Sequence, residues 1–199
     1  MKKAWTYLAL GDSYTIGEAV TAAESFPYQL QAALKMKGIA LAEPQIIAKT
    51  GWTTDELLAA IAEQKPASNF DLVTLLIGVN NQYRGYPLNT YEREFKQLLT
   101  LAIGFAEGDA AKVRVVSIPD WGVTPFAAKE GRDAARVAEE IDAYNGINKL
   151  VSMAMGVTYI DITPHSRLAA NDLSLLAVDE LHPSGKMYAE WVTQLLVTL

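Results

Sequence analysis

The chain has 199 residues, half of them hydrophobic, with a formal net charge of −6 and no cysteine. This length and hydrophobicity allow one sizeable core, so we expect a single domain over residues 1–199. The acidic balance argues against nucleic-acid binding, which needs clustered Lys and Arg, and the lack of cysteine excludes disulfides, thiolate metal sites and thiol nucleophiles.

The N-terminal segment, residues 1–10, places two lysines before an apolar run, as signal peptides do. The apolar run is short and leads directly into Gly11-Asp12-Ser13, so we interpret residues 5–10 as a first strand. A cytoplasmic location follows if Met1 is the native start. No apolar run approaches the length that crosses a bilayer, so we expect no stable membrane insertion.

Apolar runs alternate with amphipathic segments along the rest of the chain, which indicates βαβ units and a parallel sheet. We expect strands near residues 5–10, 44–49, 71–77, 113–118 and 156–161. Apolar residues at spacings of three and four predict helices over residues 24–37, 54–63, 89–107, 132–155 and 183–196. With right-handed crossovers, these elements form an α/β fold, a three-layer α/β/α sandwich.

Ser13 follows the first predicted strand, at the edge where open α/β sheets bind ligands. Its neighbour Gly11 would let the backbone turn sharply and let a substrate approach. Gly-Asp-Ser is also ordinary turn sequence, so alone it does not identify a nucleophile. A serine hydroxyl is a poor nucleophile at neutral pH, so catalysis requires a base and a group that orients the base.

The two histidines of the chain, His165 and His182, are the candidate bases. Asp179 precedes His182 by three residues, so on one loop its carboxylate can reach one imidazole nitrogen and leave the other facing Ser13. His165 also follows a predicted strand, but no acid stands at matching spacing after it. We favour His182 and keep His165 as the alternative.

Two other strand ends offer hydrogen-bond donors for negative charge that develops on a carbonyl oxygen. Asn80 follows the buried strand 71–77 and could donate from its amide, while Gly51 follows strand 44–49 and could present a bare backbone N–H. Each position also suits a structural turn. Asn80 favours an Asx-turn, and Gly51 precedes a possible threonine helix cap.

In type and order, these motifs resemble the four sequence blocks of the SGNH hydrolases, also called the GDSL esterase and lipase family. The blocks in this chain are Gly11-Asp12-Ser13, Gly51, Gly78-x-Asn80 and Asp179-x-x-His182. The resemblance spans nearly the whole chain and implies a flavodoxin-like sheet of five parallel strands in the order 2-1-3-4-5. Two positions depart from the family pattern: Tyr14 replaces a leucine and Asn81 replaces a common aspartate, which puts substrate preference in doubt.

The resemblance also implies roles for individual residues. Ser13 attacks the acyl carbon, His182 acts as general base and then general acid, and Asp179 orients it. The implied oxyanion hole combines the backbone N–H groups of Ser13 and Gly51 with the side chain of Asn80. It implies an ester as substrate, with no metal and no cofactor.

Four side chains near the same edge are candidates for contact with substrate: Trp52, Tyr83, Arg84 and Trp121. The aromatic ones could stack on a sugar or line an acyl groove, or they could merely cap the sheet. Nothing in the sequence resembles a large hydrophobic lid, so we expect an esterase for small or medium acyl esters.

The sequence leaves several alternative functions open. Within the family, a carbohydrate O-acetyl esterase, a lysophospholipase or a thioesterase are the alternatives, and from another class a noncatalytic ligand-binding module. An FMN or nucleotide binder is disfavoured because the chain has no Gly-x-Gly-x-x-Gly or Walker motif. An ordinary α/β-hydrolase needs Gly-x-Ser-x-Gly, which is also absent.

Overall fold

The computed structural model describes residues 4–199, and within them five parallel strands form one sheet in the order β2-β1-β3-β4-β5. The strands are β1 (Tyr7–Gly11), β2 (Gln45–Ala48), β3 (Leu72–Leu76), β4 (Val113–Val116) and β5 (Thr158–Ile160). The predicted sheet and its order are confirmed. The predicted first strand is wrong at its start, because Trp5 only bridges Leu41 and β1 begins at Tyr7. Residues 1–3 lie outside the described residues.

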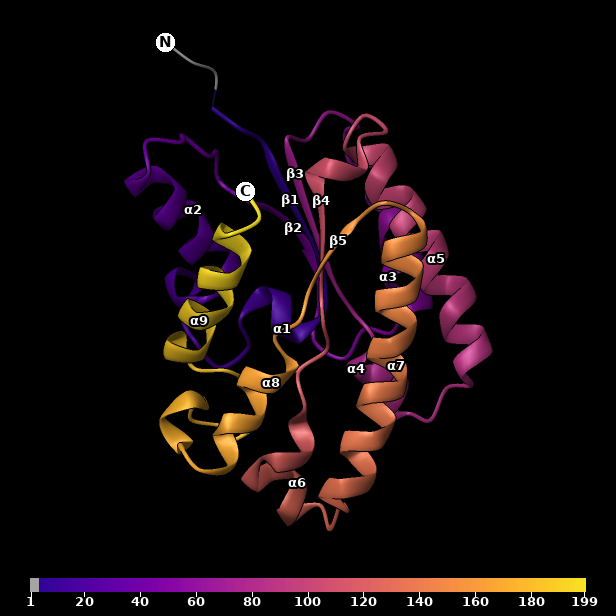
Figure 1. Ribbon diagram of the computed structural model, residues 1–199, viewed down its shortest axis with the longest axis vertical. Coiled ribbons are helices and arrows are strands. Elements are labelled where there is room, and N and C mark those ends of the chain that lie inside the picture. The colour runs from indigo at the N-terminus through magenta and orange to yellow at the C-terminus, as the bar shows by residue number, and fades with distance from the viewer. Residues whose placement is uncertain (1–3) are drawn as a thin grey trace.

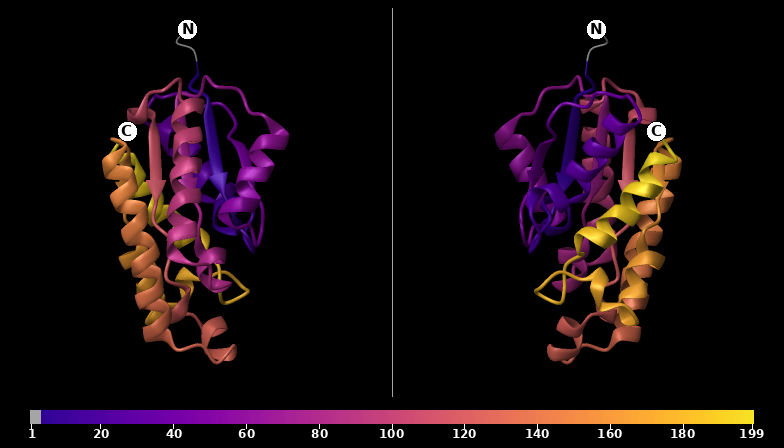
Figure 2. Two further views of the ribbon diagram at one scale, coloured as in Figure 1. Left: turned by 90° about the vertical axis from the view of Figure 1, so that its right-hand side faces the viewer. Right: turned by 90° about the vertical axis from the view of Figure 1, so that its left-hand side faces the viewer.

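Long helices cover both faces of the sheet (Figures 1 and 2). One face carries α2 (Phe26–Met36) and α9 (Gly185–Leu196), and the other carries α3 (Thr54–Gln64), α5 (Leu88–Phe105) and α7 (Ala134–Ala154). The expected three-layer sandwich is therefore confirmed. The strands β1 and β3 are buried along their whole length, as their continuous apolar runs predict.

Three helices, α2, α7 and α9, begin two residues later than the periodicity predicts, and side-chain capping explains the shifts of α7 and α9. The helix predicted from residue 183 begins at Gly185, because the Ser184 hydroxyl accepts the Met187 N–H and so forms the N-cap. Likewise α7 begins at Ala134, because the Asp133 carboxylate accepts the N–H groups of the first turn. An N-cap residue has non-helical dihedrals, so the residues before it cannot continue the helix.

Four short helices gather at the carboxyl ends of the strands: α1 (Ser13–Ile16), α4 (Val79–Tyr83), α6 (Pro125–Lys129) and α8 (Thr163–Ser166) (Figure 1). They are too short to show helical periodicity, so the sequence does not predict them. Of these, α1 begins at Ser13, α4 contains Asn80, and α6 follows the loop that carries Trp121. Across residues 4–199, no helix combines the length and apolar character needed to span a membrane.

Candidate active site

A cavity of about 270 Å³ opens at the carboxyl ends of the strands. Four predicted site residues line it, each from a different segment: Ser13, Gly51, Asn80 and His182. Two of the proposed substrate contacts, Tyr83 and Trp121, line it as well. The parallel topology brings these segments together, since every strand ends at this edge of the sheet.

The loop before α9 holds Asp179 against His182. The Asp179 Oδ2 and His182 Nδ1 atoms are 2.6 Å apart, and Asp179 Oδ1 accepts the backbone N–H groups of Leu181 and His182 at 3.1 and 3.0 Å. Partial burial raises the pKa of Asp179, but hydrogen bonds from His182 and from the two N–H groups outweigh it and leave the pKa below its ordinary value. The carboxylate is thus charged at neutral pH and able to fix the imidazole.

The alternative base, His165, lies in α8 and does not line the cavity. Its Nδ1 is 2.8 Å from the Gln194 Nε2 of α9, so the imidazole is held by a neutral amide. Within the described chain, His182 is the histidine that shares a cavity with Ser13.

Ser13 is the first residue of α1 and is only 4% exposed. Because the first N–H groups of a helix have no partner inside it, the Ser13 N–H is available to a ligand. The Ser13 Oγ makes no hydrogen bond within residues 4–199, so it shares the cavity with His182 without a direct bond. Catalytic hydrogen bonds are often long or absent before substrate binds.

Gly11 is required for a different reason from the one that the sequence indicates. It is the last residue of β1 rather than a turn residue. A Cβ at this position would lie 2.1 Å from Thr15 Oγ1 and 2.3 Å from the Leu76 carbonyl oxygen. The interpretation as a turn is therefore wrong: Gly11 permits close packing of β1 against α1 and β3.

Asp12 is the N-cap residue of α1. Its Oδ1 accepts the Tyr14 N–H at 3.0 Å, which confirms that Asp12 shapes the loop locally. Its Oδ2 is buried and has no hydrogen-bond partner. Burial raises the pKa of Asp12 to about 7, although the Tyr14 N–H partly opposes the shift.

This raised pKa predicts a pH dependence of stability. From pH ~4 to ~7 the unfolded chain loses the Asp12 proton while the folded protein keeps it, so the free energy of unfolding should fall as pH rises. Asp12→Asn retains the capping oxygen and removes the titration. Urea unfolding at several pH values should therefore show the wild type losing up to about 4 kcal/mol relative to Asp12→Asn across this window. Parallel pH profiles for the two proteins would contradict the assignment.

The two candidate oxyanion donors approach the cavity from neighbouring loops. Gly51 has φ +85°, a conformation that favours glycine, and its N–H has no hydrogen-bond partner among residues 4–199. Asn80 lies in α4, where its Nδ2 donates one hydrogen bond to the Trp52 carbonyl at 3.0 Å. A side-chain amide has two N–H groups, so a second donor remains.

Trp52 and Arg84, which the sequence suggests as substrate contacts, do not line the cavity. The Arg84 guanidinium donates to the Gly51 carbonyl at 2.6 Å and pairs with Glu56 at 3.3 Å. The Trp52 carbonyl accepts the Asn80 amide. Both residues therefore bond to the segments that carry the candidate donors: Arg84 ties the Gly51 loop to Glu56 of α3, and Trp52 ties it to Asn80 of α4.

Asn81, which departs from the family pattern, is fully buried and points away from the cavity toward α3. Its Nδ2 donates to Thr54 Oγ1 at 2.7 Å, and its Oδ1 accepts the Thr54 N–H at 3.1 Å. Tyr14, the other departure, lines the cavity and packs against the His182 ring with centroids 5.4 Å apart. Of the two departures, only Tyr14 can contact a ligand.

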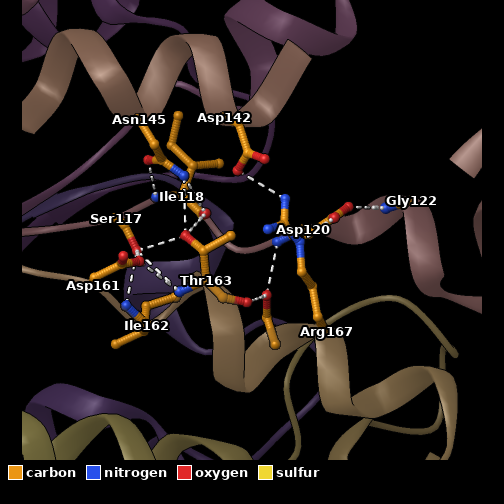
Figure 3. Close-up of polar contacts among 11 residues, drawn as sticks. Ser117, Ile118, Asp120, Gly122, Asp142, Asn145, Asp161, Ile162, Thr163 and Arg167 are labelled. Atoms are coloured by element: carbon orange, nitrogen blue, oxygen red, sulfur yellow. Dashed lines mark hydrogen bonds and ion pairs between the residues drawn. The ribbon is translucent and has the colours of Figure 1, made fainter. Parts of the chain in front are cut away.

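Trp121 forms a fixed wall of the cavity on the loop after β4. Its Nε1 donates to Gln82 Oε1 at 2.8 Å, and Gln82 donates in turn to Glu140 at 2.7 Å. Beside it, the buried Asp120 carboxylate accepts Arg167 Nε at 2.9 Å, as Figure 3 shows. These bonds come from α4, α7 and the turn after α8, so three separate elements hold the wall.

A second group of buried bonds in Figure 3 joins the ends of β4 and β5. Ser117 Oγ accepts the N–H groups of Ile162 and Thr163 at 2.9 and 3.1 Å. From α7, the Asn145 amide bonds both the N–H and the carbonyl of Ile118. This group explains why the loop after β4 leaves the sheet in a defined direction.

Comparison with known proteins identifies a family that matches this chain. The model of the GDSL-like lipase/acylhydrolase family matches residues 9–190. No curated protein matches the sequence significantly.

Solved structures share the fold. An extracellular lipase from Streptomyces rimosus has 17% identity and a TM-score of 0.75, covering 98% of this chain and 100% of its own. A lipase/acylhydrolase from Enterococcus faecalis has 18% identity and a TM-score of 0.73, with coverages of 97% and 94%. A variant of a Geobacillus acetyl-xylooligosaccharide esterase has 18% identity and a TM-score of 0.69, with coverages of 98% and 93%. At these identities, the similarity concerns the fold.

Proposed function

Because the chain belongs to the GDSL-like lipase/acylhydrolase family and is a carboxylic ester hydrolase, we propose that it cleaves small or medium acyl esters through a triad of Ser13, His182 and Asp179. The observation that carries this proposal is the 2.6 Å contact between Asp179 and His182 at the rim of the cavity that contains Ser13. A base held by a carboxylate beside a serine is the arrangement that nucleophilic catalysis requires.

In the proposed acylation step, the Ser13 Oγ attacks the acyl carbon and its proton passes to the His182 Nε2. Asp179 keeps the other ring nitrogen protonated and stabilises the imidazolium. The bond to the alcohol then breaks, and the alcohol leaves with the proton from His182. In the second step His182 takes a proton from water, the hydroxide attacks the acyl-serine, and the acid departs as Ser13 recovers its proton.

The negative charge on the carbonyl oxygen in each step needs fixed donors. We assign this role to the backbone N–H groups of Ser13 and Gly51 and to the free N–H of the Asn80 amide. The bonds from Arg84 to Gly51 and from Asn80 to Trp52 support the assignment, since they restrain both loops before substrate arrives.

The size of the cavity supports the substrate class. Its volume of about 270 Å³ lies at or below the lower end of the range for small-molecule sites, roughly 300–1,000 Å³. Tyr14, Tyr83, Trp121 and Phe126 give it aromatic walls. Such a cavity suits a short acyl chain or a single ring better than a long lipid chain.

A screen of p-nitrophenyl esters with increasing acyl length tests the proposal. We expect kcat/KM to be highest for short or medium acyl chains and to fall for long ones, because a long chain cannot be enclosed. Acetylated sugars and thioesters in the same screen separate the other activities proposed within the family. Hydrolysis of long-chain emulsified lipid with none of short esters would contradict the proposal, and the absence of any hydrolysis would favour a noncatalytic binding module.

A further inference from the structure

A second cavity, of about 390 Å³, adjoins the ester cavity. Tyr83 lines both, so its ring forms part of the partition between them. The second cavity lies between α4 and the start of α7, which are neighbours in Figure 1. Its other walls include the polar side chains of Gln82, Arg132 and Glu140.

Arg132, in the segment between α6 and α7, places a positive charge against this partition. Its guanidinium carbon lies 4.7 Å from the centroid of the Tyr83 ring and 5.7 Å from that of Trp121. The two rings pack on each other with centroids 5.4 Å apart, and both line the ester cavity. An arginine that stacks on rings still presents its N–H groups at the edge of the guanidinium plane.

The Arg132 charge is not neutralised by a direct partner. Both oxygens of the nearby Glu140 carboxylate have other partners, since Oε2 accepts Gln82 Nε2 at 2.7 Å and Oε1 accepts Arg136 Nε at 2.9 Å. Within residues 4–199, the Arg132 side chain makes no hydrogen bond or ion pair. It therefore differs from Arg136, which is paired with Glu140 on the same helix.

We propose that Arg132 forms an anion subsite beside the ester cavity, so that the enzyme prefers esters that carry a carboxylate or similar anionic group beyond the Tyr83 and Trp121 rings. The inference rests on the proposed ester hydrolysis in the first cavity. A guanidinium binds carboxylates through paired, charge-assisted hydrogen bonds. The chain as a whole is acidic, with a net charge of −6, so a local cation is needed to favour an anionic substrate.

Matched pairs of rigid esters test the subsite on each side of the scissile bond. On the alcohol side the pair is para-acetoxybenzoate and para-acetoxybenzamide, and on the acyl side it is monophenyl terephthalate and its carboxamide. The carboxylate and the amide have nearly the same shape, so the ratio of their kcat/KM values isolates the charge. The para geometry also prevents the carboxylate from attacking its own ester.

We expect Arg132→Met to lower this carboxylate-to-amide ratio by about three- to tenfold for one of the two pairs, the effect of one exposed charge contact. Arg132→Lys keeps the charge but loses the stacked guanidinium, so it should retain only part of the ratio, and added salt should reduce the ratio in the wild type. The control Arg93→Met, at an exposed arginine of α5 that lines neither cavity, should leave it unchanged. An equal ratio in wild type and Arg132→Met, or an equal loss in Arg93→Met, would overturn the proposal.

A binding measurement separates this inference from the proposed function. If no ester is hydrolysed, ester hydrolysis fails as the function, and calorimetric binding of para-hydroxybenzoate and para-hydroxybenzamide still decides the subsite. The wild type should bind the carboxylate more tightly than the amide, and Arg132→Met should abolish the difference. Equal binding of the two compounds by the wild type would overturn the subsite.

Discussion

Ser13→Ala and His182→Ala should each lower kcat by about 10⁴-fold or more, while the double variant should lose little beyond either single one. The reason is that the hydroxyl and the imidazole act as one unit: without the base the serine is a poor nucleophile, and without the serine the base has nothing to activate. Steady-state hydrolysis of a p-nitrophenyl ester, with the three variants compared at saturating substrate, measures the effect.

His165→Ala is the matched control for the histidine variant. His165 contacts Gln194 and lies outside the cavity, so its removal should leave kcat close to that of the wild type. Full activity in His182→Ala with loss in His165→Ala would reverse the assignment of the base. Losses that multiply in the double variant would show that Ser13 and His182 act independently, contrary to a triad.

Asn80→Ala should lower kcat by about 100- to 1,000-fold, the scale expected for one oxyanion donor. KM should change little, since the donor acts on charge that is present only in the transition state. Asn80→Asp should fail as well, because the carboxylate keeps the shape of the side chain but supplies no N–H. The kinetics of both variants are measured with the ester used for Ser13→Ala.

A structural role for Asn80 makes a different prediction. If the hydrogen bond to the Trp52 carbonyl serves only to hold the loop, Asn80→Ala should lower the melting temperature and raise KM while kcat stays within tenfold of the wild type. That combination would remove Asn80 from the oxyanion hole.

Much of the fold could be predicted from the sequence because its signals are local. The buried strands are continuous apolar runs, and the long helices show clear periodicity, so both were located to within a few residues. Helix starts at α7 and α9 shifted because single caps at Asp133 and Ser184 decide them. The short helices around the cavity carry no periodic signal, and only the structure reveals them.

The candidate site also has one part that the sequence predicts and another that only the structure reveals. Ser13, Gly51 and Asn80 follow strand ends, so a parallel sheet brings them together whatever their side-chain conformations. The contacts of Arg84 with Gly51 and of Arg132 with Tyr83 join segments far apart in sequence, and they depend on rotamers that no motif records. Gly11 shows the same limit, since its turn-like sequence concealed a packing requirement.

The central claim, that Ser13 is an activated nucleophile, is tested most directly by covalent labelling with an active-site-directed fluorophosphonate. Digestion and mass spectrometry of the labelled protein should place a single phosphonyl group on the peptide that contains Ser13, with labelling strongly slowed in His182→Ala. No adduct on the folded wild type, or an adduct on another residue, would contradict the proposed mechanism.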